Sequence, residues 1–500
     1  MSQLIPLFIV LPLLGAFLNS LFVRKNTKVS DILSLLITFS LSVISFLSLF
    51  LVNKYGVLIY KVGGWRPPLG ITLVLDGLSS LLLLTVCLVS FFISLYSINY
   101  MEKYTSKEKF YTLFLLMLAG MNGVVATGDL FNLFVFLELA SVASYALVAF
   151  GTEKEELEAS FKYAIMSSVA SLFILLGIGI IYSFTSTLNM ADIAKTLGGS
   201  LNKVVVFAGI LFFMGFGLKA SIVPFHAWLP DAHPSAPAPI SASLSGLLIK
   251  SLGIYSLVRV IYNVLGLKEL FSLPLMFLGT VSIMVGVVLA IGQWDFKRLL
   301  AYHSISQVGY IILGIGLGTP LGILGGLFHL FNHSLFKSLL FLNSGAVEYS
   351  TGSRQLLKIK DLGLRSKMPF TSLTTLIASL SISGIPPFNG FFSKLIVIFS
   401  CIKAGFFGYA FWAIVGSILT LASFMKVYRY SFSTEHTENR EIKEAPFFMK
   451  LAMLSLSLLC ILSSFLFLNK FSNFFLGPAQ KTLLEAKNYS TINDFVENVR

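Results

Sequence analysis

Four lysines stand inside long apolar stretches of this 500-residue chain: Lys219, Lys250, Lys337 and Lys394. A lysine near the middle of a spanning helix costs roughly 2.5–3.5 kcal/mol on insertion scales, and such residues usually mark a path for ions or protons. Lysine suits proton transfer because desolvation readily lowers its pKa, whereas arginine stays charged. One such lysine could belong to a structural ion pair. Glu138 is the one clear mid-span carboxylate, so the set cannot consist of structural pairs alone.

Glu138 lies in the segment DLFNLFVFLELASVASYALV, with Ser141 and Tyr145 three and seven residues later. This spacing places the three polar side chains on one face of a helix. A nearby lysine would stabilise the ionised carboxylate. A pair of Glu138 with Lys219 would therefore change its charge state when the lysine loses its proton.

The segment HLFNHSLFK carries His329, His333 and Lys337 at intervals of four residues. They would follow one helix face, about 6 Å apart at each step. Histidine titrates near physiological pH and can pass a proton through its two nitrogens. Two histidines four residues apart can also bind zinc, but the stripe holds no carboxylate and ends in a lysine. We favour a proton relay over a metal site, with helix-to-helix hydrogen bonding as a further alternative.

The segment AYHSISQVGY places four polar side chains on one helical face: His303, Ser306, Gln307 and Tyr310. Such a face is either a polar access route to the water side or ordinary hydrogen bonding between helices. The sequence leaves both interpretations open.

The composition is that of an integral membrane protein, with 56% hydrophobic and 12% charged residues. Soluble domains have about 25% charged residues. The net charge of +13 is largely explained by lysines in cytoplasmic loops, so nucleic acid is not an expected partner. Cys87, Cys401 and Cys460 lie singly in apolar runs, which argues against iron–sulfur clusters and structural zinc. We expect no cofactor and no metal.

Since a span needs about 20 mostly apolar residues, the sequence predicts an all-α membrane protein with about 14 spans. The predicted spans are 3–23, 29–52, 76–100, 110–128, 130–150, 161–184, 203–223, 239–262, 271–292, 299–317, 321–347, 371–402, 407–429 and 447–468. No soluble domain fits between them. The first span is expected to be retained, because 4–21 lacks a basic flank and a cleavage site.

Two of the predicted spans, the seventh and the twelfth, are interrupted near a lysine. Pro224 follows Lys219, and Pro386 and Pro387 precede Lys394. Proline removes a hydrogen bond to the carbonyl four residues back, so the carbonyls of Ala220, Ile382 and Ser383 should be freed. Broken helices five spans apart are expected of transporters built from two inverted repeats.

The predicted organisation has four parts. Residues 1–109 form helices one to three, 110–262 the first five-helix repeat, 271–429 the second, inverted repeat, and 447–500 the last helix and tail. Alternate loops starting after the first span hold about 19 lysines and arginines and the opposite set about 11, so both termini should face outside.

Five segments resemble the antiporter-like subunit family found in respiratory complex I, Mrp-type multisubunit sodium/proton antiporters and membrane-bound hydrogenases. They are GDLFNLFVFLELASVASYALV, KASIVPFHAWLPDAHPSAPAPISASLSGLLIK, KRLLAYHSISQVGY, HLFNHSLFKSLLFL and SGIPPFNGFFSK. The resemblance implies fourteen helices with two inverted five-helix repeats and broken helices 7 and 12. It implies that Glu138 and Lys219 form a modulating pair and that Lys250 is the central relay. His329, His333 and Lys337 would continue the proton path, and Lys394 would end it.

The subtype is indicated by residues 62–83, VGGWRPPLGITLVLDGLSSLLL, which are most similar to the D-type Mrp subunit and its hydrogenase relatives. Lys394 also stands where one complex I member usually has glutamate, and the chain lacks the long lateral helix of the largest complex I member. The resemblance implies a proton-translocating membrane subunit with other membrane subunits, and protons with or without sodium, as its partners. A proton-pumping subunit of NADH:quinone oxidoreductase is the alternative.

Other function classes make different demands on the sequence. A redox subunit would need a cysteine cluster, a nucleotide-binding glycine motif or paired haem histidines, none of which the sequence contains. A stand-alone solute symporter would need a polar substrate cavity in place of a row of lysines. Whether the complex as a whole is an enzyme stays open, because this chain holds no redox centre of its own. We expect a multi-pass protein of a prokaryotic plasma membrane.

Overall fold

The computed structural model describes residues 2–22, 27–199, 202–432 and 441–492. Within these ranges, eleven helices are long and apolar enough to cross a membrane, which confirms the membrane class. They are Ser2–Leu21, Thr27–Tyr55, Gly77–Lys103, Lys107–Ala126, Leu130–Val148, Lys154–Thr185, Ala238–Val264, Lys268–Ile291, Phe296–Gly316, Phe407–Ser431 and Phe447–Phe467.

Helices also occupy the three predicted spans that are missing from this set. Helix α8 (Lys203–Lys219) corresponds to the seventh span, and α14 (Pro320–Thr351) to the eleventh. The twelfth is divided into α17 (Pro369–Ser383) and α18 (Asn389–Lys403). Interruption makes α8, α17 and α18 short, whereas α14 is long but less apolar because histidine, asparagine and lysine lie along it.

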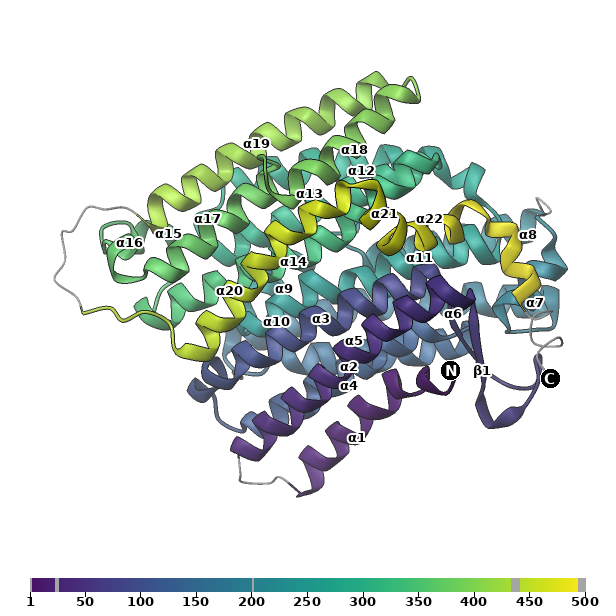
Figure 1. Ribbon diagram of the computed structural model, residues 1–500, viewed down its shortest axis with the longest axis horizontal. Coiled ribbons are helices and arrows are strands. Elements are labelled where there is room, and N and C mark those ends of the chain that lie inside the picture. The colour runs from purple at the N-terminus through teal and green to yellow at the C-terminus, as the bar shows by residue number, and fades with distance from the viewer. Residues whose placement is uncertain (1, 23–26, 200–201, 433–440, 493–500) are drawn as a thin grey trace.

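The helix axes run between two ends of the molecule (Figure 1). One end carries α15 (Leu356–Ile359) and α16 (Leu364–Lys367). The other carries α7 (Met190–Leu197) and the hairpin of β1 (Leu58–Lys61) and β2 (Thr72–Leu75), paired antiparallel with Leu58 opposite Leu75. Helices α1 (Leu7–Phe22) and α19 (Phe407–Ser431) lie on opposite edges of the bundle.

The remaining helices complete the bundle in chain order. They are α2 (Thr27–Tyr55), α3 (Gly77–Tyr100), α4 (Lys107–Ala126), α5 (Leu130–Val148), α6 (Lys154–Thr185), α9 (Leu229–Ser235), α10 (Ala238–Ser243), α11 (Ser256–Val258), α12 (Lys268–Ile291), α13 (Phe296–Gly316), α20 (Phe447–Leu462), α21 (Asn469–Phe475) and α22 (Gly477–Leu484).

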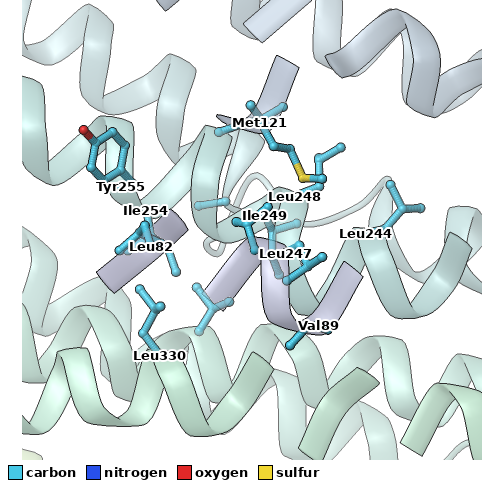
Figure 2. Close-up of a cluster of buried hydrophobic side chains, with 14 of the residues drawn as sticks. Leu82, Val89, Met121, Leu244, Leu247, Leu248, Ile249, Ile254, Tyr255 and Leu330 are labelled. Carbon is cyan, nitrogen blue, oxygen red and sulfur yellow. The ribbon is translucent and has the colours of Figure 1, made fainter. Parts of the chain in front are cut away.

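The core surrounds a helix with an unusual backbone. Between α10 and α11 the segment Leu244–Tyr255 is a π-helix, and a second π-helical segment, Arg259–Val264, follows α11. Figure 2 shows Leu247, Leu248 and Ile249 of this helix among side chains of α3, α4 and α14, such as Leu82, Met121 and Leu330. Every residue from Ala238 to Val264 is buried, so Lys250 lies at the centre of the molecule.

The first helix break comes earlier than the sequence predicts. Helix α8 ends at Lys219 instead of reaching position 223. Ser221 takes a left-handed backbone conformation (φ 58°), which stops a helix of L-residues. The indole of Trp228 donates to the carbonyl of Leu218 at 3.1 Å. The helix end is therefore fixed by a side chain beyond the break as well as by Pro224.

The second break has the predicted form. Helix α17 ends before Gly384, whose φ of 75° is the left-handed conformation that glycine adopts without strain. The carbonyls of Ile382 and Ser383 are free to accept other donors, as the prolines predict. Lys394 donates to the first at 2.7 Å and the Ser417 hydroxyl to the second at 2.9 Å.

The π-helix packs against the end of α8 without room for a side chain at Gly253. A Cβ at this position would lie 2.5 Å from the backbone nitrogen of Ala220. We expect Gly253→Ala to destabilise the protein by about 1–3 kcal/mol, the usual range for overpacking. Thermal unfolding of the detergent-solubilised protein measures the effect. Gly179→Ala is the matched control, since a Cβ there meets nothing within 4 Å; equal melting temperatures for the two variants would contradict the prediction.

Candidate functional site

The ammonium group of Lys219, at the end of α8, is surrounded by polar side chains of α5 and α6. Its ammonium nitrogen is 3.8 Å from the Oε1 of Glu138 on α5. It also donates to the hydroxyls of Ser141 on α5, at 2.9 Å, and Ser167 on α6. The Ser171 hydroxyl donates to Glu138. The Lys219 side chain is 2% exposed and that of Glu138 33%, so the pair joins a buried cation to a carboxylate that reaches the surface.

The predicted pair of Glu138 and Lys219 is thus brought together in space, although the two residues are far apart in sequence. Their separation of 3.8 Å is near the outer limit of an ion pair. Because hydroxyls also bind the ammonium group, Lys219 can keep hydrogen bonds when its distance to Glu138 changes. The geometry permits a variable ion pair.

Lys250 and Lys337 are fully buried and bind backbone carbonyls. Lys250 donates to the carbonyl of Ser245 on its own helix, and Lys337 to the carbonyl of Leu300 on α13. Neither forms an ion pair within the part of the chain that the structure describes. Two ammonium groups without counter-charges repel each other strongly in a medium of low dielectric constant, so the proton of one destabilises that of the other.

His329 and His333 lie on the same face of α14, as their spacing predicts. Their rings are parallel within 10° and their centroids are 6.3 Å apart. The Nδ1 of His329 is 3.0 Å from the Ser393 hydroxyl on α18. Neither nitrogen of His333 has a hydrogen-bond partner among the described residues. The described residues contain no group of three histidine, cysteine or acidic side chains that could hold a metal, so a zinc site here lacks a third ligand of these types.

Lys394 lies at the second helix break. Besides the carbonyl of Ile382, its ammonium group is 3.4 Å from the Ser417 hydroxyl and 4.7 Å from the centre of the Tyr310 ring. A pocket of about 240 Å³ between α17, α18 and α19 opens at Lys394. Tyr310 is also 5.5 Å from His329, ring to ring, so it connects the histidines to Lys394.

The sequence left two interpretations open for the polar side chains of α13: an access route for water, or hydrogen bonding between helices. The structure assigns different roles to different members of this set. The Nε2 of His303 is 2.9 Å from the Ser423 hydroxyl of α19, which is hydrogen bonding between helices. Tyr310 instead joins the line of titratable groups. Ser306 and Gln307 are buried, and their side-chain atoms have no hydrogen-bond partner within the described ranges.

One buried ion pair escapes sequence analysis. Arg259 lies near the end of the predicted span 239–262, yet its side chain is 2% exposed and 2.7 Å from the Asp76 carboxylate. Asp76 also caps α3 by accepting from the Ser79 amide. An arginine flanked by apolar residues on both sides was the signal for a buried partner.

A second charge network lies at the end of the bundle that carries α15. Lys297 is 2.9 Å from Glu348, and Arg354 contacts both Asp295, at 2.6 Å, and Glu348, at 3.4 Å. Partial burial disfavours the charged guanidinium, but Asp295 and Glu348 outweigh it and raise the pKa of Arg354 above its ordinary value. These pairs hold together the segments that meet at this end of the bundle.

Two protein families match segments of this chain. The one described as NADH:quinone oxidoreductase/Mrp antiporter, TM, matches residues 126–420, and the one described as NADH-ubiquinone oxidoreductase (complex I), chain 5 N-terminus, matches residues 66–111.

Curated relatives and a solved structure agree with these descriptions. NADH-quinone oxidoreductase subunit N of Desulforudis audaxviator is 40% identical over 74% of each chain. The D-type member of the Na(+)/H(+) antiporter of Alkalihalophilus pseudofirmus is 34% identical over 86% of this chain and 88% of its own. A chain in the structure of the Mrp complex from Dietzia superposes with a TM-score of 0.90 at 28% identity, covering 99% of this chain and all of that one.

The pair of Arg259 and Asp76 yields a stability prediction. Arg259→Leu leaves a buried carboxylate without a counter-charge, which typically costs about 3–5 kcal/mol. We expect the variant to unfold at a markedly lower temperature and Asp76→Asn with Arg259→Leu to recover most of the loss. Lys443→Leu is the control, because its pair with Glu441 is almost fully exposed. Equal melting temperatures for the single and double variants would show that the pair is unimportant.

Proposed function

We propose that this chain, which belongs to the NADH:quinone oxidoreductase/Mrp antiporter family of membrane proteins, moves protons through the middle of the membrane as one subunit of a larger complex. The observation that carries the proposal is the set of four buried lysines. Within the described ranges, Lys219 alone among them has a carboxylate near its ammonium group. Buried lysines without counter-charges are unfavourable for stability but suited to binding and releasing protons.

The pair of Glu138 and Lys219 would control the protonation of Lys250. When Lys219 lies close to Glu138, its charge is compensated and Lys250 can hold a proton. When the pair opens, the charge of Lys219 is no longer compensated, and Coulomb repulsion in the low-dielectric interior favours release of the proton from Lys250. The serine hydroxyls that bind Lys219 stabilise it while the pair is open.

From Lys250 the proton would pass along α14 through Lys337, His333 and His329 to Lys394. The rings of the two histidines are stacked, and Tyr310 lies between His329 and Lys394. Buried polar groups are nearly always hydrogen-bonded, to water where protein offers no partner. We therefore expect ordered water beside His333 and Gln307 to complete the path.

The architecture we propose has fourteen spans in two inverted repeats, 110–262 and 271–429, flanked by 1–109 and 447–500. Support comes from the two breaks: each half contains an interrupted helix with a lysine beside the interruption, Lys219 in α8 and Lys394 in α18. The protein would be a multi-pass protein of a prokaryotic plasma membrane with both termini outside. The end that carries α15 and α16 would then face the cytoplasm.

Partner subunits are needed at the surface around Glu138. One third of this side chain is exposed, on a helix whose neighbouring apolar side chains Val135 and Val142 are also exposed. Contact of an ionised carboxylate with lipid is costly. We infer that another membrane subunit covers this face. The similarity to a chain of the Mrp complex from Dietzia supports assembly with other chains.

Two kinds of complex fit this chain. An Mrp sodium/proton antiporter, with this chain as its D-type member, is favoured by the antiporter relative that matches over most of both chains. A redox-driven pump, such as NADH:quinone oxidoreductase or a membrane-bound hydrogenase, is favoured by the NADH-quinone oxidoreductase relative. The chain itself would carry only the ion path in either complex.

Purification of the native complex through a tag on this chain, followed by mass spectrometry, separates the two complexes. Only small hydrophobic antiporter subunits would identify a sodium/proton exchanger. Nickel–iron or iron–sulfur proteins in the same preparation would identify a redox-driven pump. Recovery of the chain without any partner would contradict the proposal.

The central pair yields a direct functional prediction. We expect Lys219→Ala and Glu138→Ala each to abolish proton transport by the complex in proteoliposomes while assembly persists, because neither variant retains a pair that can open and close. Lys443→Ala is the control, since the side chain of that lysine is 85% exposed. Normal transport by either pair variant would refute the proposed path.

Lys394 provides a test of the path's far end. Both lysine and glutamate can carry a proton, but they have opposite charge when ionised. We therefore expect Lys394→Glu to retain transport with a shifted pH profile, and Lys394→Leu, which cannot carry a proton, to lose it. Proton flux measured over a range of pH distinguishes the two. Equal activity of both variants would remove Lys394 from the path.

A further inference from the structure

Helix α12 is bonded to the chain just after the first helix break through one side chain. The backbone amide of Val223, four residues after Lys219, donates to the hydroxyl of Ser282 at 3.1 Å. Ser282 is fully buried, and its hydroxyl donates to the carbonyl of Leu278 on the same helix at 2.7 Å. Within the described ranges, the bond from Val223 is the only hydrogen bond that joins residues 220–225 to a helix other than α8. Ser282 therefore fixes where the chain after Lys219 lies relative to α12.

Helix α12 is packed so closely against α13 that the two helices must move together. A Cβ on Gly279 of α12 would lie 2.9 Å from the carbonyl oxygen of Gly309 on α13. A Cβ on Gly286 would lie 2.5 Å from the backbone nitrogen of Ser306. Two backbones in such contact resist sliding, because a close-packed interior has no free volume to take up the shift. A displacement of α12 at Ser282 is therefore shared by α13.

Ile283, the residue after Ser282, packs against α19 beside the second break. Its buried side chain fills the space over Gly416 of α19, where a Cβ would collide with it. A Cβ on Gly416 would also lie 3.1 Å from the hydroxyl of Tyr310, which donates to the carbonyl of Ala413 on α19. Ile283 and Tyr310 therefore both pack against α19 at Gly416, so a shift of α12 reaches Tyr310 by two routes.

Tyr310 is the side chain through which α13 contacts Lys394. The ammonium nitrogen of Lys394 is 4.7 Å from the centre of the ring, and the face of an aromatic ring attracts a cation. The position of the ring therefore affects how well the protonated form of Lys394 is stabilised. The other titratable side chains that interact electrostatically with Lys394 are His303, His329 and His333.

We propose that Ser282 is a positioning residue of the proton path, through which α12 couples the two helix breaks and transmits the state of the Glu138 and Lys219 pair to Lys394. This inference rests on the proposed function and adds a link that orders its steps. The link acts through a hydrogen bond and close packing. It is therefore distinct from Coulomb repulsion along the row of lysines.

The coupling follows the contacts from one break to the other. When the pair of Glu138 and Lys219 opens, the chain that follows Lys219 shifts with it. The hydrogen bond from Val223 passes this shift to α12, and the close packing of α12 passes it to α13. The ring of Tyr310 then moves away from Lys394, which releases its proton to water in the pocket between α17, α18 and α19. Lys394 is thus ready to accept the next proton that arrives along α14.

The test measures proton flux by the intact complex in proteoliposomes over a range of pH. We expect Ser282→Ala, which leaves the Val223 amide without its acceptor, to lower the flux severalfold. Its pH profile should be displaced in the same direction as that of Tyr310→Phe, which frees the ring from α19. Ser282→Thr keeps the hydroxyl and should retain most of the flux. Thr280→Ala is the control and should change neither quantity, because the Thr280 hydroxyl binds only the carbonyl of Met276 on its own helix.

The double variant decides whether Ser282 and Tyr310 act through one link. Residues that act through one link have non-additive effects, whereas the losses from independent sites multiply. We expect Ser282→Ala combined with Tyr310→Phe to show the flux and the pH profile of the more impaired single variant. Losses that multiply would overturn the coupling, and so would wild-type flux with a wild-type pH profile in Ser282→Ala.

Failure of the coupling is distinguishable from failure of the proposed path. Full transport by Lys219→Ala would refute the path itself, whereas the coupling is refuted by the Ser282 variants while Lys219→Ala stays inactive. If Ser282→Ala does not assemble, Ser282→Cys applies the same test, because a thiol is a weaker acceptor than a hydroxyl. A Ser282→Cys complex with the flux and the pH profile of the wild type would likewise overturn the coupling.

Discussion

The structure depends on keeping ammonium groups in an apolar interior without carboxylates beside them. Lys250, Lys337 and Lys394 each solve this by donating to a backbone carbonyl. In a regular α-helix such carbonyls already accept from amides four residues on, but a carbonyl oxygen has two lone pairs and can accept a second donor, as that of Leu300 in α13 does from Lys337. The irregular backbone of this protein is found at two of these places: the π-helix around Lys250 and the break before Lys394.

The same constraint makes the two ends of the lysine row different. Lys219 has Glu138, a carboxylate that reaches the surface of the protein. Lys394 has a carbonyl, a hydroxyl and the face of Tyr310. A charge that changes at the first end is felt along the row, because unscreened like charges interact over several ångströms in a low-dielectric interior. The charge of Lys219 is compensated by Glu138, and that of Lys394 by no carboxylate among the described residues. A change of charge at Lys219 can therefore act along the row toward Lys394.

Sequence reasoning succeeded where polar residues are rare. Lys219, Lys394 and the stripe from His329 to Lys337 stand out in apolar helices, and prolines mark both breaks, so local pattern alone located them. It failed where the decisive contact is distant in sequence. Asp76 and Arg259 are 183 positions apart, the end of α8 depends on Trp228, and the hydrogen bond from Val223 to Ser282 joins the first break to α12. No periodicity predicts a π-helix, since its apolar residues resemble those of any buried helix.

The charges of this protein divide into two classes by their partners, and the division indicates their roles. Arg259 with Asp76, Lys297 with Glu348 and Arg354 with Asp295 are matched pairs near the helix ends. A matched pair resists any change of protonation, because losing one proton leaves the partner charge buried and alone. Lys250 and Lys337 lack such partners within the described ranges, so their protons can leave at little electrostatic cost. The paired charges hold the helices in register, and in the proposed path that rigidity would let the unpaired lysines keep their spacing while protons move between them.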